Sequence, residues 1–552
     1  MKKSKRGMVF THSLFAVGLG MLGLLQSPVA GAFSFDLGGD ITGAFDTDIT
    51  YGYMRRTAGA NFSSTRQTVS ASYGNRVLFP EAGDTISNAI RVSHALELKR
   101  GDTGFLMHGN YFYDAAFRGK DLPTDTRNSL LHAEDITDAF IYTKLGNNFT
   151  LRVGQQIINW GENTFIQGGI SDVNTFDIKK LRVPGADLKD AYIGTKAIDL
   201  AWSADNLTIE GFALFKYDQA RLDAMGSPFS TQDAAVDGGG FDLGGNGVAG
   251  GGCVSAGTPA GRCDLFGGRL VRTSDQRARK NGQWGIAIRK FFPDFFSGGE
   301  VALYAQNLHD HLPSVSTYAR TGLFFVENPK DIKRYGISFN TTVAALAVSG
   351  EWSIRKGAPI QLIKPLSNGL AAAFGPFAPD LTIPVGTYQQ GWAKADRQQL
   401  QVTVQKNWGV VHQLGADGGS SIIEMAVGKV NNLPAANQLF EPTLTHSWSG
   451  FQMKHSLLYQ AALFNLVALT PNFAYRWDLR GNSNEFGGGK AFVAGRRAAT
   501  LGLDFDYMSG RYKGGIGYTN FFGKNSDKNV GNGLLNGTVD RDFIQANVSI
   551  SF

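Results

Sequence analysis

The stretch from Arg541 to Phe552 constrains the fold of this chain most strongly, because its side chains alternate in character. The apolar side chains share one parity, namely Ile544, Ala546, Val548, Ile550 and Phe552. The intervening positions from Gln545 to Ser551 are polar. Successive side chains of a β-strand point to opposite faces of its sheet, so this pattern predicts a strand with one apolar and one polar face.

The sequence stops on this strand with an aromatic residue, and that arrangement resembles the terminal strand that the assembly machinery of bacterial outer-membrane barrels reads. A strand in lipid cannot leave its backbone edge unpaired, so it must close on the first strand of the same chain. We therefore expect an all-β, transmembrane antiparallel β-barrel in the bacterial outer membrane. Val548, Ile550 and Phe552 are expected at the closure, and the assembly machinery and outer-membrane lipid are expected partners.

The first 32 residues predict a secretory signal peptide. Four Lys and Arg side chains precede an apolar run over about 15–25, and Ala30 and Ala32 mark a small-residue cleavage site. The run is too short to span a bilayer, and no later run reaches about 18 apolar residues. We expect residues 1–32 to be removed and residues 33–552 to form a single barrel domain that begins at Phe33.

Composition argues against a nucleic-acid partner. The formal charge is +6, from 53 basic and 47 acidic residues, but four of the basic residues and none of the acidic ones lie in the predicted signal segment. The remaining charges nearly balance, so there is no basic surplus to attract phosphates. The 70 glycines, the 12% of aromatic residues and the mean hydropathy of -0.14 fit strands with one wet face.

Alternating runs joined by short turns recur along the chain and predict β-hairpins. A first strand is expected over 33–53 and a last one over 541–552, with eight pairs between them. The pairs are 90–98 with 105–113, 139–145 with 150–160, 195–203 with 207–217, 281–291 with 299–309, 333–343 with 347–356, 396–408 with 420–430, 451–462 with 468–479, and 498–508 with 511–522. Short joints within pairs and long joints between them are typical of outer-membrane barrels with long extracellular loops. The count is 18 strands, with 16 as the alternative.

The joint over 218–280 is rich in glycine and contains both cysteines of the chain, Cys253 and Cys263. Two cysteines this close in an exported chain predict a disulfide. A metal site would need more ligands than two thiols, and neither a His nor a third Cys lies nearby. We therefore expect a disulfide, and neither a metal nor a cofactor.

A second joint carries a distinctive set of residues: Trp160, Gly161, Glu162, Asp177, Arg182, Pro184 and Gly185. With Gly350-Glu351-Trp352 and Asp540-Arg541-Asp542-Phe543, this set resembles the proteobacterial family called domain of unknown function 1302, over nearly the whole of 33–552. The resemblance implies an outer-membrane barrel. It also implies two partners, a periplasmic protein of unknown-function family 1329 and an inner-membrane efflux-type permease, and hence trafficking of a hydrophobic or lipid-like molecule.

The segment over 160–185 has two interpretations. Pro and Gly can turn a loop back into the barrel, charged groups can bond across the lumen, and Trp can anchor it. The same residues also suit a solvent-exposed surface loop. The sequence leaves both interpretations open.

Enzymatic function is not indicated. The chain lacks Gly-x-Ser-x-Gly, His-Glu-x-x-His and Gly-x-x-x-x-Gly-Lys-[Ser/Thr] motifs. His94 and His108 fall on adjacent expected strands, but only His94 shares the parity of the lipid-facing residues. We expect no catalytic residue.

Large apolar side chains on the expected wet faces favour a particular kind of passage. Leu106 and Phe112 lie beside His108, and Phe212 and Leu214 lie beside Glu210. Apolar surface in a watery lumen costs about 25 cal/mol per Å² unless something covers it. We therefore expect a conduit for hydrophobic or lipid-like molecules. A passive porin for small polar solutes and a loop-mediated surface receptor or adhesin are the alternatives.

Overall fold

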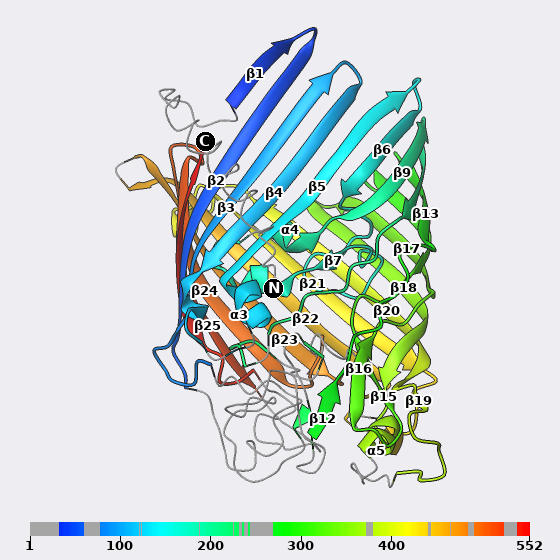
Figure 1. The fold of residues 1–552 in the computed structure, drawn as a ribbon. Coiled ribbons are helices and arrows are strands. Elements are labelled where there is room, and N and C mark those ends of the chain that lie inside the picture. The colour runs from blue at the N-terminus through cyan, green and yellow to red at the C-terminus, as the bar shows by residue number, and fades with distance from the viewer. Residues whose placement is uncertain are drawn as a thin grey trace, which may run out of the picture.

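The chain forms a closed antiparallel β-barrel of 18 strands. Figure 1 shows how the strands run side by side around the barrel. The computed structural model describes residues 33–59, 78–120, 122, 124–186, 188–224, 226–230, 235–236, 241–242, 269–370, 379–439, 443–463, 465–483, 491–523 and 538–552. The predicted signal segment, with Ala30 and Ala32, and the predicted disulfide between Cys253 and Cys263 lie outside the described residues.

All eight predicted strand pairs are present, and the expectation of 18 strands is confirmed. The barrel strands are β2 (Ile41–Arg56), β3 (Thr85–Arg100), β4 (Thr103–Asp114), β5 (His132–Leu145), β6 (Phe149–Gln156), β9 (Thr195–Ala204), β10 (Leu207–Leu214), β13 (Gln283–Phe292), β14 (Gly299–Leu308), β17 (Ile332–Val343), β18 (Leu346–Gln361), β20 (Trp392–Trp408), β21 (Gly418–Asn431), β22 (Ser447–Leu463), β23 (Val467–Arg480), β24 (Arg496–Tyr507), β25 (Tyr512–Gly523) and β26 (Phe543–Ser551). Each strand pairs with its neighbours in sequence order.

The last strand closes the barrel on the first. In the antiparallel ladder between β26 and β2, Val548 lies opposite Tyr51, and Ile550 lies opposite Ile49. Phe552 continues this contact, because its carbonyl oxygen accepts the N–H of Thr47 at 2.8 Å. The ladder leaves no open edge along the closing strand, as lipid requires.

The predicted first strand over 33–53 is wrong in one respect, because it is two strands. β1 (Phe33–Gly38) turns back on β2 through Gly38, Gly39 and Asp40, whose φ angles are 81°, 61° and 63°. These left-handed conformations suit a tight hairpin turn. Phe33 of β1 lies opposite Phe45, so β1 occupies the part of the β2 edge that β26 does not reach.

The outer face of the barrel is apolar and places the protein in the outer membrane. Exposed side chains on this face are Ile141, Ile198, Leu200, Ile286, Ile288, Leu303, Ile337, Leu400, Met425, Val427, Leu501, Ile516, Ile544 and Val548. Exposed aromatic residues occur near strand ends, as Trp284 and Tyr335 do at one rim and Trp408 at the other. Trp352 is an exception, since it is exposed in the middle of β18.

The long joints carry further elements at the rim opposite the short turns (Figure 1). A five-stranded sheet there has the order β11-β12-β16-β15-β19. Its strands are β11 (Phe241–Asp242), β12 (Arg269–Arg272), β15 (Ser314–Tyr318), β16 (Leu323–Glu327) and β19 (Tyr388–Gln389). Among the described residues, the helices of the long joints outside the lumen loop described below are η3 (Ala115–Phe117), α3 (Thr124–Leu131), α5 (Lys364–Leu370) and η7 (Ala436–Gln438), whereas η6 (His412–Leu414) lies in the short joint between β20 and β21. Within the described part of the chain, no helix has the length and apolar character needed to cross a bilayer.

Candidate functional site: a loop across the lumen

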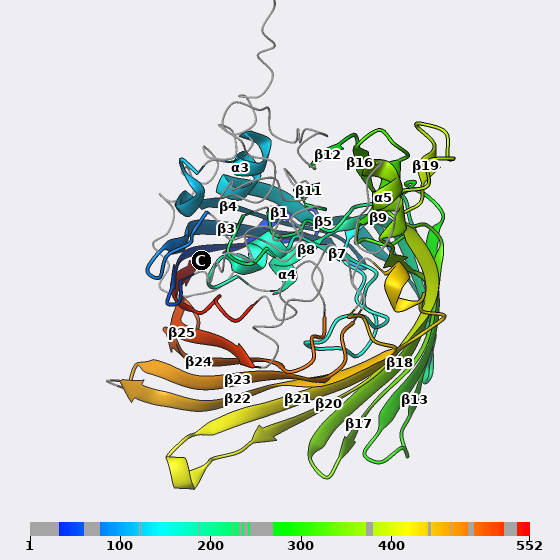
Figure 2. The same ribbon diagram turned by 90° about the horizontal axis from the view of Figure 1, so that it is seen from below.

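The described residues between β6 and β9, which are 157–186 and 188–194, lie inside the barrel, and we call them the lumen loop (Figure 2). The loop contains β7 (Thr175–Phe176), η4 (Ile178–Arg182), α4 (Leu188–Ala191) and β8 (Tyr192–Ile193). Its contacts reach two opposite walls of the barrel, as the next paragraphs describe. Of the two interpretations that the sequence left open, the structure therefore shows the inward-folded loop.

Two carboxylates on the barrel wall hold the first part of the lumen loop. Glu351 of β18 accepts the main-chain N–H groups of Glu162 and Ile170 at 2.8 and 2.9 Å. Glu424 of β21 accepts three consecutive N–H groups, with distances of 2.8, 2.6 and 2.6 Å, from residues 164–166. Only 2% of Glu351 and none of Glu424 is exposed. Hydrogen bonds to a charged acceptor are stronger than those between neutral groups, and here they compensate for burying the carboxylates.

The close approach of these carboxylates explains the glycines of the loop. Gly161 has a φ of 88°, and a Cβ added to it would lie 2.6 Å from Oε2 of Glu351. A Cβ on Gly169 would overlap the other oxygen of the same carboxylate. Any side chain at either position would displace Glu351 from the N–H groups that it accepts. The Trp160-Gly161-Glu162 motif thus places the loop backbone directly on Glu351.

A row of three arginines lies beside the carboxylates. Arg334 of β17, Arg355 of β18 and Arg397 of β20 are directly opposite one another in the two ladders. Arg334 donates from Nη1 to the carbonyl oxygen of Asp172 at 2.7 Å, and Arg355 forms an ion pair with the Asp172 carboxylate. The loop therefore contributes one acidic residue to a basic stretch of the lumen wall.

The second part of the lumen loop contacts the opposite wall. Lys180 donates to Oδ1 of Asn110 on β4 at 2.7 Å and forms an ion pair with Asp135 on β5 at 2.8 Å. Asp190 forms an ion pair with Arg91 of β3. With the bonds to Glu351 and Glu424, these contacts span the lumen from β3–β5 to β17–β21.

Pro184 and Gly185 lie on the closure between β2 and β26. A Cβ added to Gly52 of β2 would lie 2.6 Å from the carbonyl oxygen of Pro184. Gly185 has a φ of 79°, and a Cβ there would lie 2.8 Å from Nδ2 of Asn547 on β26. Arg91 also donates from Nη2 to the carbonyl oxygen of Gly185 at 2.9 Å.

Asp177 and Arg182 connect the lumen loop to the segment that follows β10. The Asp177 carboxylate caps η4 by accepting the N–H of Lys179 at 3.1 Å, and it lies 3.3 Å from Nη1 of Arg221. Burial raises the pKa of Asp177, while the neighbouring Lys179 and Arg221 act in the opposite direction. Arg182 donates from Nε and Nη2 to the carboxylate of Asp223 at 3.0 and 2.7 Å.

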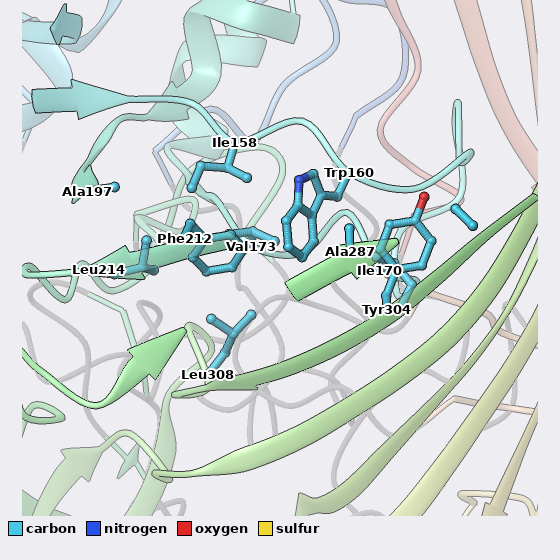
Figure 3. Packing of buried hydrophobic residues seen from close by; sticks show 11 residues of the cluster. Ile158, Trp160, Ile170, Val173, Ala197, Phe212, Leu214, Ala287, Tyr304 and Leu308 are labelled. Atoms are coloured by element: carbon cyan, nitrogen blue, oxygen red, sulfur yellow. The ribbon is translucent and has the colours of Figure 1, made fainter. Parts of the chain in front are cut away.

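Trp160 anchors the loop in an apolar cluster against the wall, shown in Figure 3. Only 1% of Trp160 is exposed, and its ring centroid lies 4.7 Å from that of Phe212 and 5.7 Å from that of Tyr304. The other members are Ile158, Ile170 and Val173 from the loop and Ala197, Leu214, Ala287, Ala302 and Leu308 from the wall. Trp160, Phe212 and Leu214 are all buried here, so the loop covers apolar side chains that the sequence placed on a wet face.

Glu162 lies at the edge of this cluster. Its Oε1 accepts a hydrogen bond from Nδ2 of Asn340 at 3.1 Å. Burial raises the pKa of Glu162, and the nearby Glu300 carboxylate raises it further, while Asn340 and Arg289 partly oppose the change.

The structure thus brings Trp160, Gly161 and Glu162 together near Glu351 on β18. It places Pro184 and Gly185 elsewhere, at the barrel closure between β2 and β26. Glu351 was part of a sequence motif, but its bonding to the loop was not predicted. Glu424 and Arg91 were not predicted at all. A charged residue at a lumen-facing position of an otherwise apolar strand could have pointed to such an acceptor. Glu424 is an example, because it lies between Ile423 and Met425.

The two histidines considered for catalysis bond to hydroxyl groups of neighbouring strands. His94 lies 2.8 Å from Oγ1 of Thr47, and His108 lies 2.6 Å from Oγ1 of Thr137, each through Nδ1. These distances join side chains on adjacent strands of the wall.

Three solved structures illustrate what the chain is similar to. OpdK of Pseudomonas aeruginosa, solved with vanillate, is 7% identical with a TM-score of 0.42, and the match covers 92% of this chain and 98% of that one. OccAB3 of Acinetobacter baumannii is 9% identical with a TM-score of 0.42, covering 92% and 99%. OccAB1 of the same organism is 11% identical with a TM-score of 0.41, covering 96% and 99%.

No curated protein matches the chain. A profile of the family described as "Protein of unknown function (DUF1302)" matches residues 13–552. This match confirms the resemblance of the motifs around Trp160 and Glu351, and it extends over nearly the whole sequence. The chain therefore belongs to the DUF1302 family.

Proposed function

We propose that this outer-membrane barrel is a conduit for amphipathic, lipid-like molecules, which pass when the lumen loop is displaced. The observation that carries the proposal is that the lumen wall has one apolar and one polar face. The lumen loop lies between these two faces and covers both.

The apolar face is formed by β9, β10, β13 and β14. Toward the long-loop rim, its lumen-facing side chains include Ala197, Phe212, Leu214, Ala287, Ala302, Tyr304 and Leu308. Toward the short-turn rim, the same strands carry Asp199, Glu210 and Arg289, which form ion pairs with Arg152 or with one another. Their neighbours in the strands, such as Ile198, Ile286 and Leu303, are exposed on the lipid side. The interior of an outer-membrane channel for water and ions is polar, so an apolar strip in this position favours a passenger with an apolar part.

The polar face is formed by β17, β18, β20 and β21. It contains the buried carboxylates Glu351 and Glu424 and the arginine row of Arg334, Arg355 and Arg397. Displacement of the lumen loop would expose both faces at once. Uncovering the apolar strip to water costs about 25 cal/mol per Å², and a lipid-like passenger would remove that cost while its polar part met the charged face.

The proposal includes the partners that the family resemblance implies. A periplasmic protein of unknown-function family 1329 and an inner-membrane efflux-type permease would deliver or receive the passenger at the short-turn rim. The support for these partners is analogy with the family.

A second candidate function is a passive porin for small polar solutes. The observation that favours it is the arginine row, which would attract anions if the lumen loop left it open to water. The two candidates differ in the passenger and in whether the lumen conducts ions freely.

Native mass spectrometry of the gently extracted full-length protein tests the proposal, with planar-bilayer recording of the same preparation as the second measurement. We expect a co-purifying amphiphile and small or intermittent conductance. Bare protein with large, unblocked openings would contradict the proposal and favour the porin.

A further inference from the structure

Part of the β5 edge beside the lumen loop, which we call the seam, has no backbone ladder to its neighbour. β5 pairs with β4 from His132 to Thr143, but its ladder to β6 covers only Ala139 to Leu145. β6 ends at Gln156, and the chain then enters the lumen. The other edge of β5 at 136–138 therefore faces Gln155, Ile157 and Gly194, where the lumen loop leaves and rejoins the wall.

The contacts across this seam involve side chains or simple proximity. The N–H of Ile157 donates to the Asp138 carboxylate at 3.2 Å, and the side-chain amide of Gln155 donates to the carbonyl oxygen of Ile136. Gly194 lies directly against the carbonyl oxygen of Thr137, with no room for a Cβ. Among these described residues, no backbone-to-backbone hydrogen bond crosses the seam. Separating its sides would therefore break side-chain contacts but no backbone ladder.

The seam lies where the apolar outer face ends. On β5, Ile136 is exposed on the lipid side, and the next outward residue toward the long-loop rim is the exposed Glu134. On β9, the outward residues change in the same direction from the exposed Ile198 to the exposed Lys196. Both flanks thus change from apolar to charged at the seam, which places it at the boundary between the acyl chains and the headgroups of the outer leaflet.

The apolar strip of the lumen begins directly behind the seam. Ile158, which follows the seam residue Ile157, is fully buried in the cluster that contains Trp160 and Phe212. Ala197 of β9, two residues after the start of that strand, belongs to the same cluster (Figure 3). An apolar group that passed between β5 and β9 would meet this cluster on the β9 side, with the Asp135–Lys180 ion pair on the β5 side.

We propose that the seam between β5 and the ends of β6 and β9 is a lateral doorway between the outer leaflet and the lumen. Its passenger is an amphiphile with an acyl-type apolar part, whose headgroup stays at the level of Glu134 and Lys196. Both stems of the lumen loop border the doorway, so displacement of the loop widens it. This inference rests on the proposed function, and it adds the route by which the passenger moves between the outer leaflet and the lumen.

A thiol cross-link across the seam tests the doorway. The full-length protein would carry C253S and C263S, with D138C and I157C bridged by a short, cleavable bifunctional thiol reagent. The matched control is I141C with V153C, a directly opposed pair in the laddered part of the same strands. Heat-modifiable gel migration establishes that each variant is folded.

The readout is transfer of a fluorescent lysophosphatidylglycerol from the outer leaflet of proteoliposomes to albumin enclosed within them. We expect the seam cross-link to reduce transfer to the protein-free rate, cleavage of the reagent to restore it, and the control cross-link to leave it unchanged. Equal transfer with and without the seam cross-link would overturn the doorway and leave the conduit standing. Transfer at the protein-free rate by the uncross-linked protein would overturn both.

Discussion

Glu424 accepts the main-chain N–H of Phe165 at 2.6 Å, although 259 residues separate the two in the sequence. The same carboxylate accepts the N–H groups on either side of Phe165, so a single side chain fixes one turn of the lumen loop. Position 424 is therefore the strongest single attachment of the loop that can be removed without altering the loop itself.

Replacement of Glu424 by Gln should loosen the lumen loop. The Gln side chain is uncharged, and its NH₂ group is a hydrogen-bond donor. This group therefore cannot accept a bond from the main-chain N–H groups of residues 164–166, which are also donors. Because bonds to a charged acceptor contribute about 1.5–3 kcal/mol each, we expect docking to weaken by roughly 3 kcal/mol and amide exchange over 162–170 to accelerate about a hundredfold. Hydrogen-exchange mass spectrometry measures this. Glu97→Gln at an exposed site is the control, and equal protection in all three proteins would refute the role of Glu424.

Replacement of Gly161 by Ala should displace the loop from Glu351. The added Cβ would lie 2.6 Å from Oε2 of Glu351, and the φ of 88° is unfavourable for alanine. Strain of this kind costs about 1–3 kcal/mol. We expect the loop around Glu162 to lose exchange protection while the barrel keeps its heat-modifiable migration. The control is Gly409→Ala, since Gly409 has no neighbour within 4 Å and an ordinary φ. Identical behaviour of the two variants would count against the steric explanation.

Replacement of Trp160 by Ala should destabilise the docked loop more than any surface change. Trp160 fills the space between Phe212 and Tyr304, and truncation of a buried Trp costs about 3–5 kcal/mol. We expect a lower thermal midpoint for the loss of compact gel migration. Trp408→Ala, at a position that is 40% exposed at the short-turn rim, is the control and should change the midpoint little. A midpoint for Trp160→Ala equal to that of wild type would contradict the anchoring role.

The pKa of Glu162 predicts how docking depends on pH. Burial raises this pKa in the docked state, so the docked state holds the proton more tightly than the undocked state does. The contribution of Glu162 to the free energy of loop docking is fully present at pH values below the ordinary carboxyl pKa. It is lost as the pH rises through the raised pKa of the docked state. We expect exchange protection over 161–166, corrected for intrinsic rates, to decrease with rising pH more in wild type than in Glu162→Gln. Parallel profiles in the two proteins would show that Glu162 does not titrate in this way.

The disulfide between Cys253 and Cys263 stays a prediction from the sequence. Intact-mass analysis of protein purified from the envelope decides it. We expect reduction to add the mass of two hydrogen atoms and to create two reactive thiols. Two free thiols before reduction would rule the bridge out, and Cys253→Ser with Cys263→Ser provides the unreactive reference.

The strands were predictable because alternation is a local signal that follows from the pleat of the backbone. The same signal failed at the first strand, because Leu37 and Ile41 keep the parity across the hairpin turn at Gly38–Asp40. It also failed for β15 and β16, where nearly every side chain is buried and no alternation remains.

The lumen loop was partly predictable, since Trp160, Gly161 and Glu162 form a local motif. Its acceptors were not predictable, because the groups that bond to Glu351 and Glu424 are main-chain N–H groups, which every residue except proline has. A sequence pattern cannot record which distant carboxylate such groups meet. The approach of Gly185 to the side chain of Asn547 was hidden because it depends on the closure of β2 and β26, which are far apart in the sequence.

The position of Pro184 and Gly185 on β2 and β26 has a consequence for the order of assembly. The surface that they occupy is shared by the first and the last barrel strands, so it does not exist until those strands have met. The loop is made early in synthesis, yet it cannot complete its docking until the wall is closed. Docking of Pro184 and Gly185 therefore follows closure of the wall, and the docked loop then bridges the two terminal strands from within.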